Sequence, residues 1–178
     1  VFCKGTTVLR NCAREPEVVD LINFLNSAGA KIKGAGESVI EIEGVDKLKK
    51  VGWSILPDRI EAGTYLVAGA ITNGHVRVKG IESNLLEPVI QKFREMGVVV
   101  NSGKNYVEVD ATTTELISCS LDTEPFPGFP TDMQAQFMAL NSIAKGVSMI
   151  AENVFENRFQ HVVELQKMGA DIQLDGHK

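Results

Sequence analysis

The sequence is poor in cysteine and has no excess of basic residues. It contains 3 cysteines in 178 residues, and neither a Cys-x-x-Cys pair nor a Cys/His metal spacing occurs. Cys3, Cys12 and Cys119 are therefore not expected to form a disulfide framework or a zinc site, and a reducing compartment fits best. The formal net charge of −5 offers no basic surface to nucleic acid or anionic lipid.

Long apolar runs are also missing. No run reaches the ~18 residues that a membrane-spanning helix requires, and no signal-peptide pattern is found. We therefore expect a cytoplasmic protein without a membrane partner. With 178 residues, of which 44% are hydrophobic and 23% charged, the chain is long enough for one or two domains with a real core.

The chain repeats itself with a period near 70 residues. Short strand-like runs open at three glycines, namely Gly5, Gly74 and Gly146. Each opening glycine is followed 23 or 24 residues later by a glycine that ends an amphipathic helix: Gly29, Gly97 and Gly169. Glycine just past a helix end is the usual left-handed cap. The spacing therefore predicts three related units.

Each unit contains further elements. Residues 62–71 and 133–144 are apolar nearly all round, so both are expected to form helices covered on several sides. Strands are expected after the helix-ending glycines, at residues 31–33, 98–100 and 171–173, and again at 39–42 and 106–109. The pattern predicts an α+β fold whose unit is a buried helix, strand, amphipathic helix, strand and strand.

The first and last units are incomplete. The first lacks the buried helix before Gly5, the third lacks its final strand, and the chain has no initiating Met. We therefore expect a segment of a longer protein with about two and a half units. Stacked repeats bury their core against neighbours, so missing neighbours would leave apolar faces open.

The best chemical clue is a carboxylate near a helix start. Asp132 follows Pro130 and Thr131, and the polar cluster 156–158 (ENR) begins 24 residues after Asp132. Asp132 is interpreted either as a helix N-cap or as a proton-transferring carboxylate at the mouth of a cleft, and the two roles are compatible. Asp58 occupies the matching position in the preceding unit and is expected to be a structural cap.

One basic side chain, Arg158, belongs to this cluster, and another, His161, follows it. Arg158 either binds a phosphate or carboxylate with its planar fork or is a solvated surface arginine. His161 is expected to be structural. Gly34 and Gly36 resemble the start of a dinucleotide fingerprint, but the run leads from strand to strand and lacks the third glycine, so no dinucleotide site is expected.

Four segments resemble the bacterial UDP-N-acetylglucosamine enolpyruvyl transferase family. They are residues 13–18 (AREPEV), 56–64 (LPDRIEAGT), 129–136 (FPTDMQAQ) and 154–159 (VFENRF). The resemblance implies transfer of an enolpyruvyl group from phosphoenolpyruvate to a hydroxyl of UDP-N-acetylglucosamine, the first committed step of peptidoglycan synthesis. It covers essentially the whole chain.

The resemblance also implies a fold. The family has two lobes, each made of three repeats arranged as an inside-out α/β barrel. Residues 1–56 would form the terminal portion of one lobe. Residues 57–178 would supply the first two repeats of the other lobe, the second of them truncated.

Three site residues follow from the resemblance. Asp132 matches an aspartate that contacts the sugar hydroxyl and transfers protons, Val154 a position whose backbone contacts the sugar nucleotide, and Arg158 an arginine that faces the phosphoenolpyruvate region. The resemblance implies no metal and no other cofactor, no nucleic-acid partner and a monomeric parent enzyme.

The family's mobile loop with its catalytic cysteine is not represented here. Cys3, Cys12 and Cys119 do not lie in that loop's motif, so the isolated segment is expected to be inactive. Two alternatives stay open. One is an enolpyruvylshikimate phosphate synthase-type transferase, and the other is a catalytically inert structural fragment.

Overall fold

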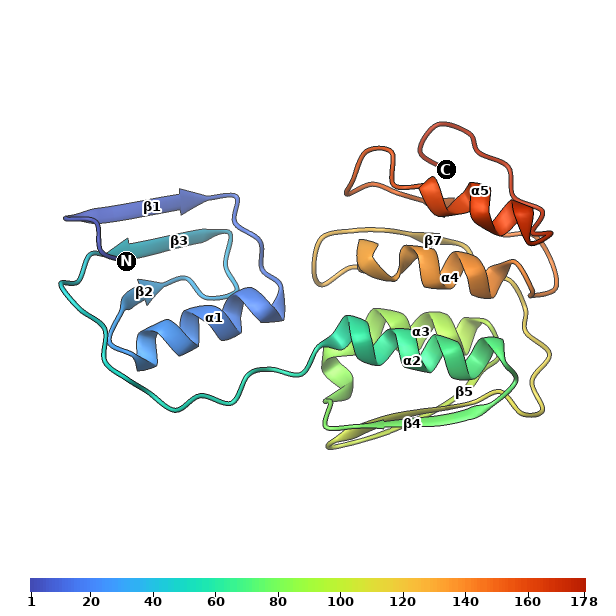
Figure 1. Ribbon diagram of the computed structural model, residues 1–178, viewed down its shortest axis with the longest axis horizontal. Helices are drawn as coiled ribbons and strands as arrows, with labels where there is room; N and C mark the ends of the chain where they lie inside the picture. The colour runs from blue at the N-terminus through green and yellow to red at the C-terminus, as the bar shows by residue number, and fades with distance from the viewer. The chain divides into compact units, whose positions relative to one another are not determined.

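The computed structural model describes all 178 residues and divides into two compact units (Figure 1). The first unit comprises residues 1–56 together with 125–127. The second comprises residues 57–124 together with 128–178. Each unit mixes helices and strands, as the predicted α+β class requires.

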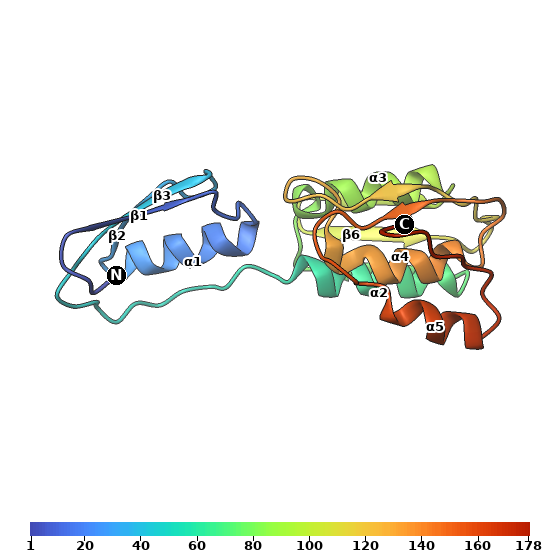
Figure 2. The same cartoon turned by 90° about the horizontal axis from the view of Figure 1, so that it is seen from above.

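The first unit is a small antiparallel sheet with one helix against it (Figure 2). Its elements are β1 (Thr6–Arg10), α1 (Pro16–Ser27), β2 (Lys31–Lys33) and β3 (Val39–Glu43). The helix contributes Ile22 and the sheet contributes Ile32 and Ile40 to a small buried cluster. Alternation along the strands and the apolar stripe of α1 bring these side chains to one interface.

The second unit holds the larger core and the remaining elements. Its helices are α2 (Arg59–Ile71), α3 (Glu87–Glu95), α4 (Gln134–Asn141) and α5 (Gln160–Lys167), with 3₁₀ turns η1 (Ser83–Leu86) and η2 (Thr131–Met133). Its strands are β4 (His75–Lys79), β5 (Val99–Gly103), β6 (Tyr106–Asp110), β7 (Leu121–Asp122) and β8 (Ile150–Ala151).

The predicted repeat is present in the topology. Each three-stranded sheet places the last strand of its repeat between the first two, in the orders β1-β3-β2 and β4-β6-β5. The predicted helix-ending glycines are also confirmed, since Gly29, Gly97 and Gly169 have φ values of 101°, 86° and 99°. That left-handed backbone is costly for other residues, so glycine ends α1, α3 and α5.

The two helices predicted to be buried lie in the core of the second unit. Leu66 and Ala70 of α2 and Leu140 of α4 are fully buried, and α2 contacts β4, β6 and α4. A Cβ at Gly69 would lie 2.7 Å from Cγ2 of Val76, so glycine is what allows α2 to approach β4 closely. At 13 residues α2 is the longest helix, and no helix has the length and apolar character needed to cross a membrane.

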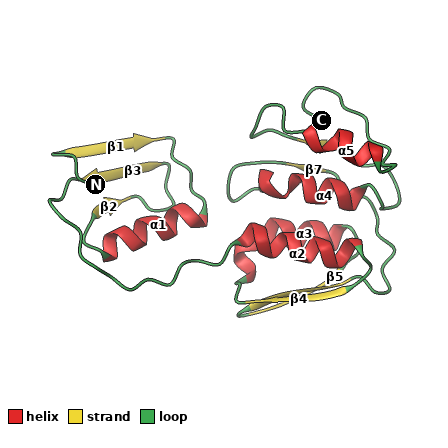
Figure 3. Ribbon diagram, viewed as in Figure 1, coloured by secondary structure: helices red, strands yellow, loops and turns green.

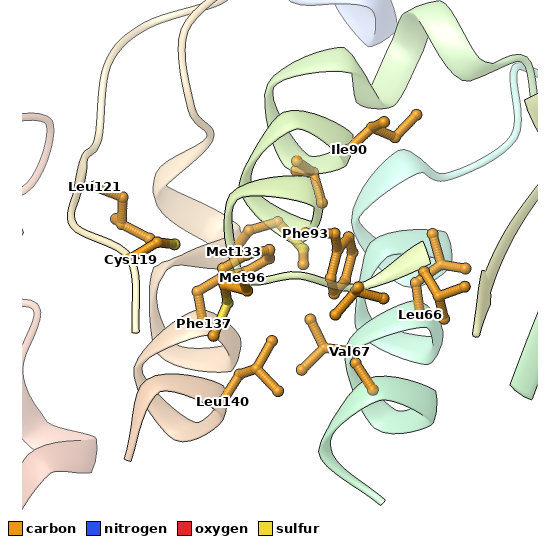
Figure 4. Packing of buried hydrophobic residues seen from close by; sticks show 14 of the residues in the cluster. Leu66, Val67, Ile90, Phe93, Met96, Cys119, Leu121, Met133, Phe137 and Leu140 are labelled. Carbon is orange, nitrogen blue, oxygen red and sulfur yellow. The ribbon is translucent and has the colours of Figure 1, made fainter. Parts of the chain in front are cut away.

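An aromatic cluster fills the space between α3 and α4 (Figure 4). The ring centroid of Phe137 lies 5.0 Å from that of Phe93 and 5.1 Å from that of Phe129. The rings are tilted or edge-on, which is the geometry that aromatic pairs prefer. Met96 and Met133 are fully buried beside them. This cluster anchors the start of α4, where the polar segment at Asp132 lies.

Two strands predicted in the third repeat differ from the structure. Residues 171–173 form no strand, because no other segment pairs with them. The strand-like run that opens at Gly146 forms a strand only at β8 (Ile150–Ala151), which pairs in parallel with β7 at Leu121–Asp122. A strand needs a hydrogen-bonding neighbour as well as an apolar pattern, so the strand predicted at residues 171–173 was wrong, whereas the strand after Gly146 is present where β7 pairs with it.

The three cysteines are free and lie in different environments. Cys3 is exposed, whereas Cys119 is buried, and this burial raises the pKa of the Cys119 thiol to about 11. Because the thiolate is the reactive form, we expect iodoacetamide at pH 8 to alkylate Cys3 much faster than Cys119. Peptide mass spectrometry of timed samples measures both rates. Equal rates in the folded chain would contradict the burial of Cys119, and a urea-unfolded sample gives the control rate.

Candidate active site

Asp132 and Arg158, which are 26 residues apart, form one ion pair. Nη2 of Arg158 donates to Oδ1 of Asp132 at 2.6 Å, and both side chains are partly exposed, at 37% for Arg158 and 53% for Asp132. Asp132 lies in the turn η2, directly before α4, and Arg158 lies in the loop between β8 and α5. Figure 3 shows the helices α4 and α5 that follow these two segments. The sequence predicted that the carboxylate and a nearby guanidinium act together, and in the structure the two side chains are in contact.

The interpretation of Asp132 as a helix N-cap is wrong. The chain enters a 3₁₀ turn after Pro130, one turn before α4, and Asp132 lies inside that turn, where no side chain caps the backbone. Asp58 is the contrasting case, since its Oδ1 accepts from the backbone N–H groups of Ile60 at 2.8 Å and Glu61 at 3.1 Å. The capping role of Asp58 is confirmed, whereas the carboxylate of Asp132 is available to Arg158.

Arg158 is held by three contacts, so the interpretation as a solvated surface arginine is also wrong. Besides its bond to Asp132, Nη1 donates to Oγ1 of Thr131 at 2.8 Å. The guanidinium carbon lies 5.1 Å from the ring centroid of Phe155, which is within the range of a cation–π contact. These contacts fix the plane of the guanidinium and the direction of its donors.

Sequence reasoning missed Glu152, which organises the site. This residue follows β8 directly and is only 3% exposed. Its Oε1 accepts from the Thr123 hydroxyl at 2.8 Å and from the N–H groups of Val154 at 2.9 Å and Phe155 at 3.0 Å. Its Oε2 accepts from the Thr131 hydroxyl at 2.9 Å. The sequence did contain a signal for this residue, which is a glutamate directly after an apolar strand. A carboxylate in that position is expected to be buried, and a buried carboxylate needs several hydrogen-bond donors.

The hydrogen bonds explain how Glu152 tolerates burial. Burial alone raises the pKa of this carboxyl, but the N–H of Phe155, the hydroxyl of Thr123, the N–H of Val154 and the hydroxyl of Thr131 together outweigh it. The pKa of Glu152 therefore lies below its usual value, and the carboxylate is ionised at neutral pH. A buried carboxylate is thus linked to the Asp132–Arg158 pair through Thr131.

Val154 and His161 lie on the same loop and on the helix that follows it. The N–H of Val154 is used by Glu152, so the carbonyl of Val154 is the backbone group left for a ligand. His161 is half-buried in the first turn of α5, and burial lowers its pKa, with a further contribution from nearby Arg158. Nε2 of His161 is buried without a hydrogen-bond partner, which is consistent with a neutral, structural imidazole.

This arrangement can move a proton and hold an anion. One carboxylate oxygen of Asp132 bonds to Arg158, and the half-exposed carboxylate can accept a further hydrogen bond from outside. The adjacent guanidinium has donors suited to carboxylate or phosphate oxygens. No group of three or more His, Cys, Asp or Glu side chains is arranged to hold a metal ion. The exposed carboxylate and the guanidinium beside it offer acid–base and electrostatic chemistry.

The sequence matches one known family over its whole length. The family model of EPSP synthase (3-phosphoshikimate 1-carboxyvinyltransferase) matches residues 1–178. The chain belongs to this family of enolpyruvyl transferases.

Within that family, the similar curated proteins share one name. UDP-N-acetylglucosamine 1-carboxyvinyltransferase of Psychrobacter sp. is 53% identical over 176 residues, which cover 99% of this chain and 40% of the relative. The protein of that name from Coxiella burnetii is 54% identical over 177 residues, which cover 99% and 41%. The predicted resemblance is confirmed. The chain spans about two fifths of the length of these relatives.

Solved structures of enolpyruvyl transferases share the fold. The enolpyruvyl transferase NikO from Streptomyces tendae superimposes with a TM-score of 0.83 at 28% identity, over 98% of this chain and 42% of NikO. EPSP synthase from Acinetobacter baumannii gives a TM-score of 0.63 at 20% identity, over 95% and 40%. The latter likeness concerns the fold alone.

Proposed function

We propose that this chain forms part of an enolpyruvyl transferase that acts on phosphoenolpyruvate and UDP-N-acetylglucosamine. The observation that carries the proposal is the contact of Asp132 with Arg158, which pairs an accessible carboxylate with an anion-binding group. Support for the sugar nucleotide comes from the 53–54% identity to relatives named for that substrate. This reaction is the first committed step of peptidoglycan synthesis.

The proposed chemistry is addition followed by elimination. The sugar hydroxyl oxygen forms a bond to C2 of phosphoenolpyruvate while C3 gains a proton, and the hydroxyl proton passes to a base. C3 then loses a proton as the bond between C2 and the phosphate oxygen breaks, which restores the double bond and releases phosphate. We assign the base beside the hydroxyl to Asp132, and general acid–base help of this kind contributes about 10²–10⁴-fold.

Arg158 and Val154 have separate roles in this proposal. The guanidinium of Arg158 faces the phosphoenolpyruvate region and offsets the charge of its carboxylate and phosphate groups. The carbonyl of Val154 accepts a hydrogen bond from the sugar nucleotide, because its N–H is already bonded to Glu152. Asp132 also binds the sugar hydroxyl before it accepts the proton.

We further propose that the two compact units belong to two lobes, each an inside-out α/β barrel of three repeats. Residues 1–56 form the terminal portion of one lobe, and residues 57–178 form the first two repeats of the other, the second truncated. The change of unit at Leu56 and Pro57 and the shared strand order of both sheets support this division. The parent enzyme is proposed to be a cytoplasmic monomer.

Acceptor specificity distinguishes this function from its nearest alternative. The family is named for EPSP synthase, a 3-phosphoshikimate 1-carboxyvinyltransferase. We expect a chimera, in which these 178 residues replace the matching segment of the Coxiella burnetii relative, to release phosphate with UDP-N-acetylglucosamine and not with 3-phosphoshikimate. A phosphate-release assay with each acceptor measures this. The 178-residue chain alone is assayed in parallel and is expected to release no phosphate. Detectable release would contradict the alternative of an inert fragment.

The opposite preference would assign the chain to the shikimate branch. The unmodified relative is the control for assay conditions, and circular dichroism of the chimera establishes that it is folded. Turnover with UDP-N-acetylglucosamine in a folded chimera means that the segment completes a working sugar-nucleotide site. Turnover with 3-phosphoshikimate alone would contradict the proposal.

A further inference from the structure

The two carboxylate oxygens of Glu152 serve different partners. Oε1 receives three donors, which are the Thr123 hydroxyl and the N–H groups of Val154 and Phe155. Oε2 receives one donor, the hydroxyl of Thr131, at 2.9 Å. One oxygen therefore shapes the loop that carries Phe155, and the other reaches the turn that carries Asp132.

A chain of hydrogen bonds leads from this buried anion to the candidate site. The Thr131 hydroxyl donates its single proton to Glu152 and accepts from Nη1 of Arg158 at 2.8 Å. Arg158 in turn donates from Nη2 to Asp132 at 2.6 Å. An ionised carboxylate can only accept, so Glu152 directs the Thr131 proton inward and leaves an oxygen lone pair facing the guanidinium.

We propose that Glu152 is a positioning residue that orients Arg158 toward Asp132 through the Thr131 hydroxyl. The consequence for turnover rests on the proposed function, whereas the orientation itself does not. Glu152 is 3% exposed, and its carboxylate accepts hydrogen bonds from four donors, so its own position is fixed. Its depressed pKa keeps it ionised, and therefore an acceptor, across the neutral range.

The variant Glu152→Gln should keep the acceptor at the Oε1 position and replace the acceptor that faces Thr131 by an NH₂ donor. Three donors converge on the Oε1 position, so the amide oxygen must occupy it and the amide NH₂ must face Thr131. The amide then donates to one lone pair of the Thr131 oxygen, and the hydroxyl loses the charged acceptor that sets the direction of its proton. The bond from Nη1 of Arg158 to Thr131 is therefore no longer held in one geometry and weakens.

The expected effect is a fall in kcat in the active chimera. Losing one hydrogen bond to a charged group corresponds to about 10- to 100-fold. Thr131→Val removes the hydroxyl at nearly constant volume, and Thr131→Ser retains it. Because Glu152 acts through that hydroxyl, adding Glu152→Gln to Thr131→Val should change kcat less than about twofold further. Additive losses in the double variant would overturn the proposal.

A second readout needs no enzymatic activity. In the 178-residue chain, the bonds from Nη1 to Thr131 and from Nη2 to Asp132 together block rotation of the Arg158 guanidinium about its Nε–Cζ bond, whereas the bond to Asp132 alone does not. The two Nη groups should therefore give separate ¹⁵N side-chain signals, assigned by their loss in Arg158→Lys. We expect these signals to merge in Glu152→Gln and in Thr131→Val, and to stay separate in Thr131→Ser. Separate signals in Glu152→Gln would overturn the proposal. Should that variant fail to fold, the Thr131 pair tests the same link.

The two readouts separate this proposal from the proposed function. Merged Arg158 signals with a reduced kcat support both. Merged signals with an unchanged kcat support the positioning role and remove Arg158 from the proposed reaction. A reduced kcat with separate Arg158 signals means that Glu152 acts by another route, which overturns the positioning role.

Discussion

Replacing Asp132 by asparagine is expected to lower kcat of the chimera by about 10²–10⁴-fold, the usual contribution of a positioned general base. The amide has the same shape and can still accept the hydrogen bond that Arg158 donates at 2.6 Å. It cannot accept the proton of the sugar hydroxyl. KM for UDP-N-acetylglucosamine should change much less, because the hydroxyl can still bond to the amide. Steady-state phosphate release over a range of acceptor concentrations measures both constants.

Asp58→Asn is the matched control for this prediction. Asp58 occupies the corresponding place before α2 and caps it through the N–H groups of Ile60 and Glu61. Asparagine caps helices about as well as aspartate, so kcat should stay within about twofold of the unsubstituted chimera. Near-normal kcat in Asp132→Asn would remove Asp132 from the reaction. A loss of similar size in both variants would indicate a general effect of removing a carboxylate.

Helices were predictable from the sequence because their signals are local. The stripe of α3 and the all-round apolar character of α2 follow from spacing within one element, and Gly97 is read directly as the end of a helix. Residues 171–173 show the limit of such signals. Their alternation predicts a strand, but pairing depends on a second segment, and none lies beside them in the structure.

The site was predictable only in part, for a related reason. Asp132 and Arg158 were found from residue type and family resemblance, but their contact depends on how η2 and the loop before α5 come together. The N-cap interpretation of Asp132 was wrong because the 3₁₀ turn begins earlier than the apolar pattern indicates. Glu152 was missed because the partners that allow its burial, Thr123 and Thr131, lie more than 20 residues away.

The largest effect on stability is expected at the aromatic cluster beneath this site. Phe137 is fully buried, and its ring lies 5.0 Å from that of Phe93 and 5.1 Å from that of Phe129. Phe137→Ala removes two aromatic contacts and leaves a cavity between α3 and α4, which should lower the free energy of unfolding by about 3–5 kcal/mol. Urea unfolding of the 178-residue chain, followed by far-UV circular dichroism, measures this change.

Two further variants test whether burial is the cause. Phe137→Leu retains most of the volume and loses only the ring, so its cost should be less than half that of alanine. Phe155→Ala removes a ring that is 57% exposed and contacts Arg158, and should cost only about 0.5–1 kcal/mol. A loss below about 1 kcal/mol in Phe137→Ala would contradict the packing of α3 against α4. That packing fixes the start of α4, and with it the turn from which Asp132 reaches Arg158.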